Sequence, residues 1–201
     1  ADFRKISSAV WKEWGFMKKI VSLILLLSML VILTCCSGGA TPVEDFLLAA
    51  GKMDIVKMEA LMTSDSAAMA ARIKEYADSL DSESRTVLVS LYSKLRYTIS
   101  KETETETGTK TVLVELTIPD MAAVKAFAEA KMAVSGESAH EIVEMMINDG
   151  TVSGSYMTEK KITVLMKSED GNWRIPYSES ENGELVTALS LVEMLRFFAL
   201  G

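Results

Sequence analysis

Cysteine and histidine are almost absent from this chain. Its 201 residues include one histidine and two cysteines, Cys35 and Cys36, which are neighbours. A framework of disulfides is excluded, because no cysteine outside the pair is available to form one. A disulfide between adjacent cysteines is strained and rare, and two neighbouring thiolates cannot supply the four ligands of a structural zinc site. The pair therefore needs another explanation.

Positive charge is scarce after residue 35. The whole chain has a formal net charge of −7, whereas residues 1–35 contain five basic and two acidic residues. Their net charge of +3 leaves −10 for residues 36–201. Nucleic acid and anionic lipid both repel a protein of this charge. Neither is expected as a partner, and attachment to a membrane would have to rest on something other than charge.

The most apolar run covers residues 20–33, which are 14 residues without a charge directly after Met17-Lys18-Lys19. A basic start, an apolar stretch of about 7–15 residues and a processing site make a secretory signal peptide, whereas a spanning helix needs about 20 apolar residues. We therefore expect a signal peptide over residues 17–35. An uncleaved anchor that extends to Cys36 is the alternative.

Residues 1–16 precede the expected start at Met17 and hold Trp11, Trp14 and Phe16 among charged residues. No export signal is expected to begin with such a stretch. We interpret it as an upstream extension outside the native mature sequence. An amphipathic cytoplasmic helix is the alternative.

The apolar run ends in Leu33-Thr34-Cys35-Cys36, which resembles the lipobox of bacterial lipoproteins. The resemblance implies that the sulfur of Cys36 receives a diacylglycerol and that the signal peptidase cuts before this residue. Cys35 then occupies the position directly before the cleavage site, where glycine or alanine is usual. The alternative is that Cys35 itself is lipidated, in which case the three residues before it match the lipobox less well. Stable anchoring takes two acyl chains, of the palmitate type. We expect an extracytoplasmic, lipid-anchored protein at the cell membrane, with residues 36–42 as its flexible tether.

The pattern from residue 41 onward is helical. Thr41, Pro42 and Glu44 form a helix start, with threonine as the N-cap and proline at the first helical position. Asp54 is placed to cap a second helix. Apolar residues at spacings of three and four then predict a third helix from Ser64 to about Leu80 and a fourth over about 87–95.

Two stretches with an apolar period of two predict β-hairpins. Residues 95–99 and 112–118 alternate between apolar and polar, and the stretch between them holds the acidic segment 103–107, which we interpret as a solvated turn. A divalent cation or a partner contact at this segment is the alternative. The second hairpin is predicted around a turn at residues 169–172.

The remaining segments are predicted to be helical. One long stretch over about 120–148, with a break at Gly136, lies between the hairpins, and a single last helix follows Asn182-Gly183. This order of helices and hairpins predicts an α+β domain over residues 43–201.

Three segments of this domain resemble NTF2-like lipoproteins of unknown function, which occur mainly in Gram-positive bacteria. They are residues 43–54, 171–176 and 182–189. The resemblance implies a cone in which N-terminal helices, a curved antiparallel sheet of hairpins, an intervening helix and a C-terminal helix surround one open end.

Catalytic and metal-binding motifs are incomplete in the sequence. Glu137, His140 and Glu144 share one helix face, but a carboxylate di-iron site needs a second Glu-x-x-His motif. Tyr156 and Lys160 match the Tyr-x-x-x-Lys pair of short-chain dehydrogenases, without the glycine-rich turn that would accompany it. We interpret Glu137, His140 and Glu144 as a solvated, charged helix face and Tyr156 as the residue at the entry of a strand. A weak mononuclear metal site is the alternative at the first.

Three further features favour structural roles. Ser138 lies between Gly136 and His140 in a partial nucleophile elbow that lacks its second glycine. Trp173 begins a predicted strand and is interpreted as a core or rim aromatic. The thirteen methionines stand mainly at apolar helical positions, where methionine fills gaps.

Two functions are consistent with this reading. The first is a non-enzymatic, membrane-tethered module that binds a small apolar ligand or a protein partner, with no cofactor, no metal and no catalytic residue. The second is an isomerase or hydrolase that uses the cone as a pocket. Such an enzyme needs a base in apolar surroundings, and its candidates near strand ends are Arg96, Tyr97, Asp120 and Tyr156.

Overall fold

The computed structural model describes residues 41–200, so the predicted upstream extension, signal peptide and lipid attachment at Cys36 lie outside the described residues. Five helical segments come first in the chain: α2 (Pro42–Gly51), α3 (Ile55–Leu61), the 3-10 turn η1 (Ser64–Ser66), α4 (Ala67–Ser79) and α5 (Ser82–Tyr92). A hairpin and three helices follow: β1 (Arg96–Glu106), β2 (Thr109–Pro119), α6 (Met121–Ser135), α7 (Ala139–Asn148) and α8 (Thr151–Ser155). The last segments are β3 (Met157–Glu169), β4 (Asn172–Arg174), α9 (Glu179–Leu189) and α10 (Leu191–Leu200).

Local side-chain caps begin several of these helices where the sequence predicts them. The hydroxyl of Thr41 accepts a hydrogen bond from the backbone N–H of Glu44 at 3.2 Å, and Pro42 occupies the first position of α2. Asp54 accepts from the N–H of Lys57 at 3.1 Å and caps α3. These caps satisfy N–H groups that have no partner inside the helix.

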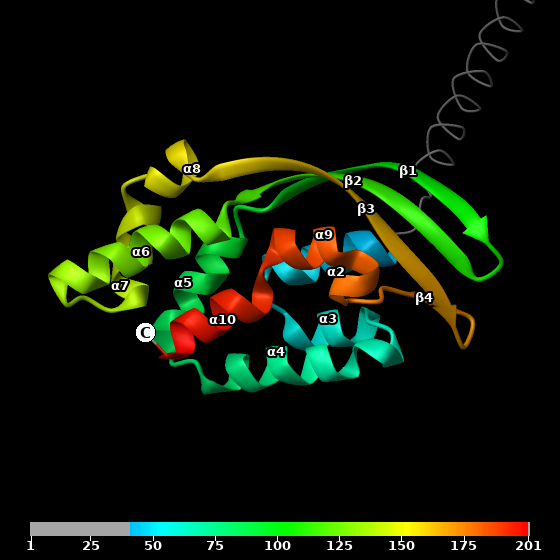
Figure 1. Ribbon diagram of the computed structural model, residues 1–201, viewed down its shortest axis with the longest axis horizontal. Helices are drawn as coiled ribbons and strands as arrows, with labels where there is room; N and C mark the ends of the chain where they lie inside the picture. The colour runs from blue at the N-terminus through cyan, green and yellow to red at the C-terminus, as the bar shows by residue number, and fades with distance from the viewer. Residues whose placement is uncertain (1–40, 201) are drawn as a thin grey trace, which may run out of the picture. The chain divides into compact units, whose positions relative to one another are not determined.

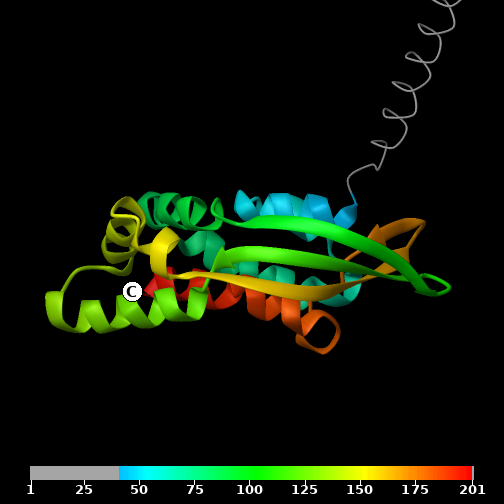
Figure 2. The ribbon, with the colours of Figure 1, turned by 90° about the horizontal axis from the view of Figure 1, so that it is seen from above.

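The four strands form one antiparallel sheet in the order β1-β2-β3-β4. In this register Val114 of β2 lies opposite Ile99 of β1 and Ile162 of β3. Within residues 112–118 of β2 and 162–166 of β3, every second residue is buried on the inner face: Val112, Val114, Leu116, Ile118, Ile162, Val164 and Met166. Figures 1 and 2 show this sheet arching over α2, α5 and α9, with α3 and α4 farther from it. The predicted α+β class is confirmed, and the sheet is open.

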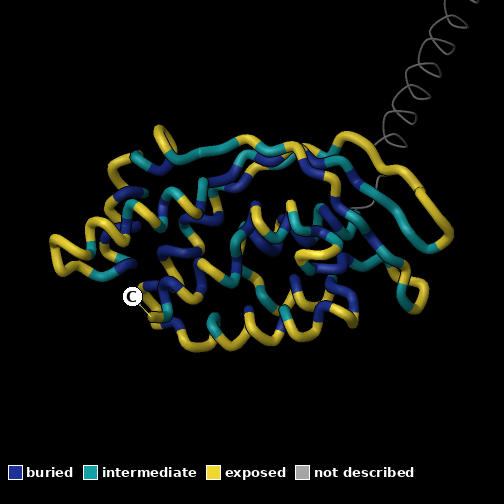
Figure 3. Tube along the Cα trace, viewed as in Figure 1, coloured by how far each residue is buried: buried dark blue, intermediate teal, exposed yellow. Residues whose placement is uncertain are grey.

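The acidic segment 103–107, predicted as a turn, is mostly strand. Residues through Glu106 belong to β1, and the turn is reduced to Thr107 and Gly108. Gly108 has φ of +83°, which glycine adopts without steric cost, so the chain reverses within two residues. The threonines between the glutamates favour extended backbone. The end of this hairpin projects from the domain and is exposed (Figure 3).

The predicted single C-terminal helix is also wrong, because the chain makes two helices there. Ser190 has φ of +46° and separates α9 from α10. The hydroxyl of Tyr92, from α5, donates a hydrogen bond of 2.6 Å to the carbonyl oxygen of Leu189. A tertiary contact therefore satisfies a carbonyl at the end of α9 that has no partner in the helix.

Candidate functional site

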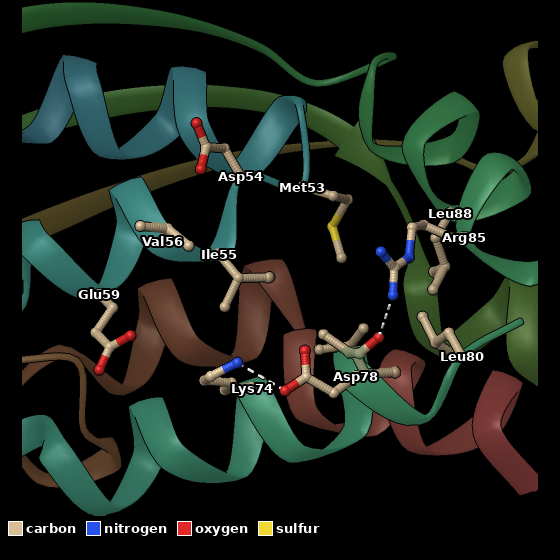
Figure 4. Close-up of a pocket in the computed structure, with 12 residues that line it drawn as sticks. Met53, Asp54, Ile55, Val56, Glu59, Lys74, Asp78, Leu80, Arg85 and Leu88 are labelled. Atoms are coloured by element: carbon tan, nitrogen blue, oxygen red, sulfur yellow. Dashed lines mark hydrogen bonds and ion pairs between the residues drawn. The ribbon is translucent and has the colours of Figure 1, made fainter. Parts of the chain in front are cut away.

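A cavity of about 270 Å³ opens among α3, α4 and α5 (Figure 4). We refer to it as the α3–α5 cavity. It is lined by Met53, Asp54, Ile55, Val56, Glu59, Lys74, Ala77, Asp78, Leu80, Arg85, Leu88 and Leu195. No strand residue lines it, so the cavity belongs to the helical layer, and the inner face of the sheet is filled by side chains.

The floor of the α3–α5 cavity is apolar. Leu80, in the connection between α4 and α5, and Leu88, within α5, are buried members of the core that line it. Met53, in the connection between α2 and α3, has φ of +53°, and its side chain points toward the cavity in Figure 4. An apolar floor favours the uncharged part of a ligand, because binding removes apolar surface from water.

Both signs of charge are present at the rim. Lys74 Nζ lies 2.6 Å from Asp78 Oδ2 in an i,i+4 ion pair, and this hydrogen bond raises the pKa of Lys74. Arg85 Nη2 donates to the carbonyl oxygen of Ala77 at 2.9 Å and ties α5 to the end of α4. Glu59 adds an exposed carboxylate at the outer edge. Lys74 and Asp78 are exposed, so their ion pair adds little stability.

The lining of this cavity is suited to binding rather than to proton transfer. It contains no histidine, serine or tyrosine, and its carboxylates belong to exposed residues. The enzyme hypothesis requires a base held in apolar surroundings next to a donor. That combination is missing from the residues that line the α3–α5 cavity.

The four candidates for the enzyme hypothesis lie away from it. Arg96 starts β1 and donates to the carbonyl oxygens of Ser93 and Leu95 at 2.7 and 2.9 Å, which is a structural role. Tyr97 is half-buried next to α2. Burial raises the pKa of its hydroxyl, and the negative charges of Glu44 and Asp45 raise it further.

Asp120 and Tyr156 are brought together, but by their backbones. The N–H of Asp120 donates to the carbonyl oxygen of Tyr156 at 2.6 Å, while the Asp120 carboxylate accepts from the N–H of Ala123 and caps α6. The Tyr156 ring packs edge-on against Phe127 with centroids 5.9 Å apart. Lys160 lies in β3 opposite Leu116. These contacts agree with the structural interpretation of Tyr156 and Lys160.

Polar side chains next to His140 cap the start of α7. Nδ1 of His140 lies 3.2 Å from the hydroxyl of Ser138, and its Nε2 lies 3.5 Å from a carboxylate oxygen of Glu83 on α5. Ser138 and Glu141 form a capping box at the start of α7, whereas Glu137 and Glu144 are exposed. Within residues 41–200, no three histidine, cysteine, aspartate or glutamate side chains are grouped so as to hold a metal ion.

Trp173 is a rim aromatic, as the sequence suggests. It is partly buried, and the ammonium of Lys110 lies 4.6 Å from its ring centroid. Lys110 also pairs with Glu102 of β1 at 2.7 Å. This cation–π contact and the ion pair join three strands near the end of the sheet.

Few features of the sequence indicate the α3–α5 cavity. The sequence predicts Asp54 as a helix cap, and the i,i+4 spacing of Lys74 and Asp78 is typical of a helical ion pair. The cavity itself depends on how α3, α4 and α5 pack and on Leu195 of α10, which is more than 100 residues away in the sequence from Leu88, the nearest of the other lining residues, so no local pattern predicts it. Within the described helices, none combines the length and the apolar character needed to cross a bilayer.

Comparison with known proteins gives little further information. No family model matches the chain, and no curated protein matches it. Among solved structures, that of the candidate lipoprotein YcdA from Bacillus subtilis is similar, with a TM-score of 0.35 and 14% sequence identity. The match covers 65% of this chain and 49% of that protein, so the chain spans about half the length of YcdA. The NTF2-like resemblance stays a prediction.

Proposed function

We propose that the chain is an extracytoplasmic lipoprotein, anchored through Cys36, whose folded domain binds a small and mainly apolar ligand. The observation that supports binding is the α3–α5 cavity, with its apolar floor and a rim that carries both signs of charge. Ligand sites are typically concave and mostly apolar, with a few polar groups that orient the ligand. At about 270 Å³ the cavity suits a ligand smaller than most drugs.

Support for the anchor comes from the sequence. Lys18 and Lys19, the apolar run and Leu33-Thr34-Cys35-Cys36 follow one another in the order of a lipoprotein signal. Thr41, which caps α2, is five residues after Cys36. Because an extended chain spans at most about 3.6 Å per residue, the tether would hold α2 within about 18 Å of the lipidated sulfur. The folded domain would therefore begin close to the bilayer surface.

The anchor is tested by expressing the full chain in a Gram-positive host with radiolabelled palmitate. The expected mature protein begins at Cys36, carries the label and partitions into detergent. Cys36→Ala should lose the label and keep the signal peptide, whereas Cys35→Ala should still be labelled. A mature form that begins at another residue, or a label lost only in Cys35→Ala, would refute the assignment to Cys36.

Binding is tested with 1-anilinonaphthalene-8-sulfonate, an apolar probe whose emission rises when it leaves water. Ala77 lines the α3–α5 cavity, so Ala77→Leu should fill part of it and reduce the rise in emission. Ala71 is exposed on the same helix, and Ala71→Leu is the matched control. Thermal unfolding shows whether both variants are folded. Equal emission from the two folded variants would place the probe elsewhere and contradict the proposal.

A further inference from the structure

The sheet has one closed edge and one open edge. On the β3 side, β4 pairs with the last residues of that strand, and next to them Asn182 and Glu184 of α9 hydrogen-bond to the strand's backbone. On the other side, β1 pairs with β2 only. Among residues 41–200, no further segment forms backbone hydrogen bonds with β1. Because alternate N–H and C=O groups of an edge strand point away from the sheet, β1 keeps a row of backbone groups with which an added strand can pair.

This open edge is accessible. β1 is a strand of 11 residues, and every residue after Ile99 is exposed. Figures 1 and 3 show this part of the strand extending past the helices at one end of the domain. Within it, residues 101–104 pair with β2 in continuous register, with one irregularity on either side. The described chain therefore leaves both space and a regular template for an added strand. We refer to the outer side of residues 101–106 as the β1 edge.

The side chains of the β1 edge are mainly acidic. Glu102, Glu104 and Glu106 outnumber Lys101, and β1 contains no proline that would block pairing. Glu102 and Glu104 are two positions apart in the continuous segment, so they share one face of the sheet. A strand added along β1 would place its own alternate residues beside these two carboxylates. In such cross-strand pairs opposite charges stabilise the sheet and like charges destabilise it.

The strand on the paired side shows which side chain suits this face. Lys110 of β2 lies opposite Glu104, and its ammonium pairs with the carboxylate of Glu102 at 2.7 Å. A lysine or arginine on an added strand would approach the same two carboxylates from the other side. The face would then carry basic side chains on both strands that flank β1.

A second copy of the chain is a poor occupant of the β1 edge. Two β1 strands related by a two-fold axis would run antiparallel and bring their acidic segments together. Residues 36–201 also have a net charge of −10, so two copies repel each other. An acidic partner is disfavoured for the same reason.

From these observations we infer that the β1 edge binds an extended segment of a partner protein that carries lysine or arginine at alternate positions. The segment adds a fifth strand to the sheet. Its backbone hydrogen bonds with β1 provide affinity, and its basic side chains beside Glu102 and Glu104 provide selectivity. The inference depends neither on the α3–α5 cavity nor on the lipid anchor.

Titration of the full chain in a non-ionic detergent at low salt tests the inference. The probe is a short peptide in which lysine alternates with valine, and it should bind with a Kd below about 1 mM. A peptide with glutamate in place of lysine should bind at least about tenfold more weakly. The lysine peptide methylated on every backbone nitrogen keeps its charge but has no N–H to donate, and it should also bind at least about tenfold more weakly. Absence of binding up to about 1 mM, or equal binding of the methylated peptide, would overturn the inference.

Paired variants separate the β1 edge from the general charge of the protein. The double variant Glu102→Gln with Glu104→Gln should weaken binding of the lysine peptide about fivefold. Glu75→Gln with Glu144→Gln changes the net charge equally at exposed positions of α4 and α7, and should leave binding unchanged. Thermal unfolding shows whether both proteins are folded. Equal weakening in the two double variants would show attraction by net charge alone and overturn the inference.

Hydrogen exchange locates the bound peptide. Backbone amides within residues 101–106 should exchange more slowly when the lysine peptide is bound, whereas those of α4 should be unaffected. Binding without this protection would overturn the inference. A concentration-dependent dimer whose amides at residues 101–106 are protected without peptide would assign the edge to a second copy and overturn it as well. Because 1-anilinonaphthalene-8-sulfonate reports on the α3–α5 cavity, the two proposals can fail separately.

Discussion

The side chain of Asn182 pairs with the backbone of Leu165 as a neighbouring strand would. Its Oδ1 accepts from the Leu165 N–H at 2.7 Å, and its Nδ2 donates to the Leu165 carbonyl at 3.0 Å. Nδ2 also donates to the carbonyl oxygen of Pro176 at 2.9 Å. Strand β4 pairs only with residues 167–169 of β3, so the edge at Leu165 would otherwise be unpaired. Asn182 leaves helical geometry, with φ of −129° and ψ of 44°, where it makes these bonds.

Replacing Asn182 should therefore be costly. Asn182 is 2% exposed, and in Asn182→Ala the N–H and C=O of the half-buried Leu165 lose their partners. Each unsatisfied buried group costs about 1–3 kcal/mol, so we expect the free energy of unfolding to fall by about 3 kcal/mol in urea denaturation. Asn148 is exposed at the end of α7, and Asn148→Ala is the control, with an expected change within about 0.5 kcal/mol. Similar losses in both variants would contradict the role of Asn182.

The two buried tyrosines should respond differently to loss of their hydroxyls. Tyr92→Phe removes the hydrogen bond to the carbonyl oxygen of Leu189, and we expect a loss of about 1–2 kcal/mol in the free energy of unfolding. Tyr177→Phe is its matched comparison, because that hydroxyl has no partner in residues 41–200. Urea denaturation of both variants without ligand measures the difference. A larger loss in Tyr177→Phe than in Tyr92→Phe would contradict the structure.

Stability should decline in acid partly through the cap of α5. The hydrogen bond from the backbone N–H of Ser84 lowers the pKa of Asp81 below its ordinary value of 3.8. A lowered folded-state pKa means that the stabilisation is complete above pH 3.8 and is lost as the pH falls through the folded-state value. Asp81→Asn keeps a good capping side chain but cannot titrate. We expect its free energy of unfolding to fall less steeply below about pH 4 than that of the unchanged chain.

A second variant separates titration from capping at this position. Asp81→Ala removes the cap at every pH, so its stability should be lower across the whole range, including neutral pH. Urea denaturation at several pH values compares the three proteins. If Asp81→Asn follows the same acid profile as the unchanged chain, Asp81 does not contribute to the pH dependence.

Two glycines should differ in their tolerance of alanine. Gly108, in the turn between β1 and β2, has φ of +83°, which costs an L-residue about 1–2 kcal/mol. Gly154, inside α8, has no such φ and open space around it. Gly108→Ala should therefore lower the free energy of unfolding by about 1 kcal/mol, whereas Gly154→Ala should raise it slightly through a better helix propensity. Equal effects of both substitutions on thermal unfolding would contradict the two-residue turn.

Helix starts were predictable because their causes are local. Thr41 and Asp54 hydrogen-bond to backbone groups three residues further along the chain, so the relevant atoms are close in sequence. The buried faces of β2 and β3 were predictable for a similar reason, since alternation places every second side chain on one face. The turn at Gly171 also follows from a short motif, with φ of +78°.

The errors occurred where distant segments decide the local conformation. Apolar spacing continues from α9 into α10, and only the backbone at Ser190, beside the contact of Tyr92 with Leu189, shows that the helix is divided. The acidic residues of β1 look like a turn in isolation. They become strand because β2, which is well paired on both sides, offers them hydrogen-bond partners as far as Thr109.

The sequence by itself determined the helix caps, the period of the strands, the α+β class and the expectation of a lipid anchor at Cys36. These follow from hydrogen bonds and apolar patterns within a few residues. Only the tertiary structure decided that Asn182 closes the edge of β3 and that α3, α4 and α5 leave a cavity between them. The reason is physical: a cavity is the space left when side chains from separate helices pack, and no local pattern specifies that space.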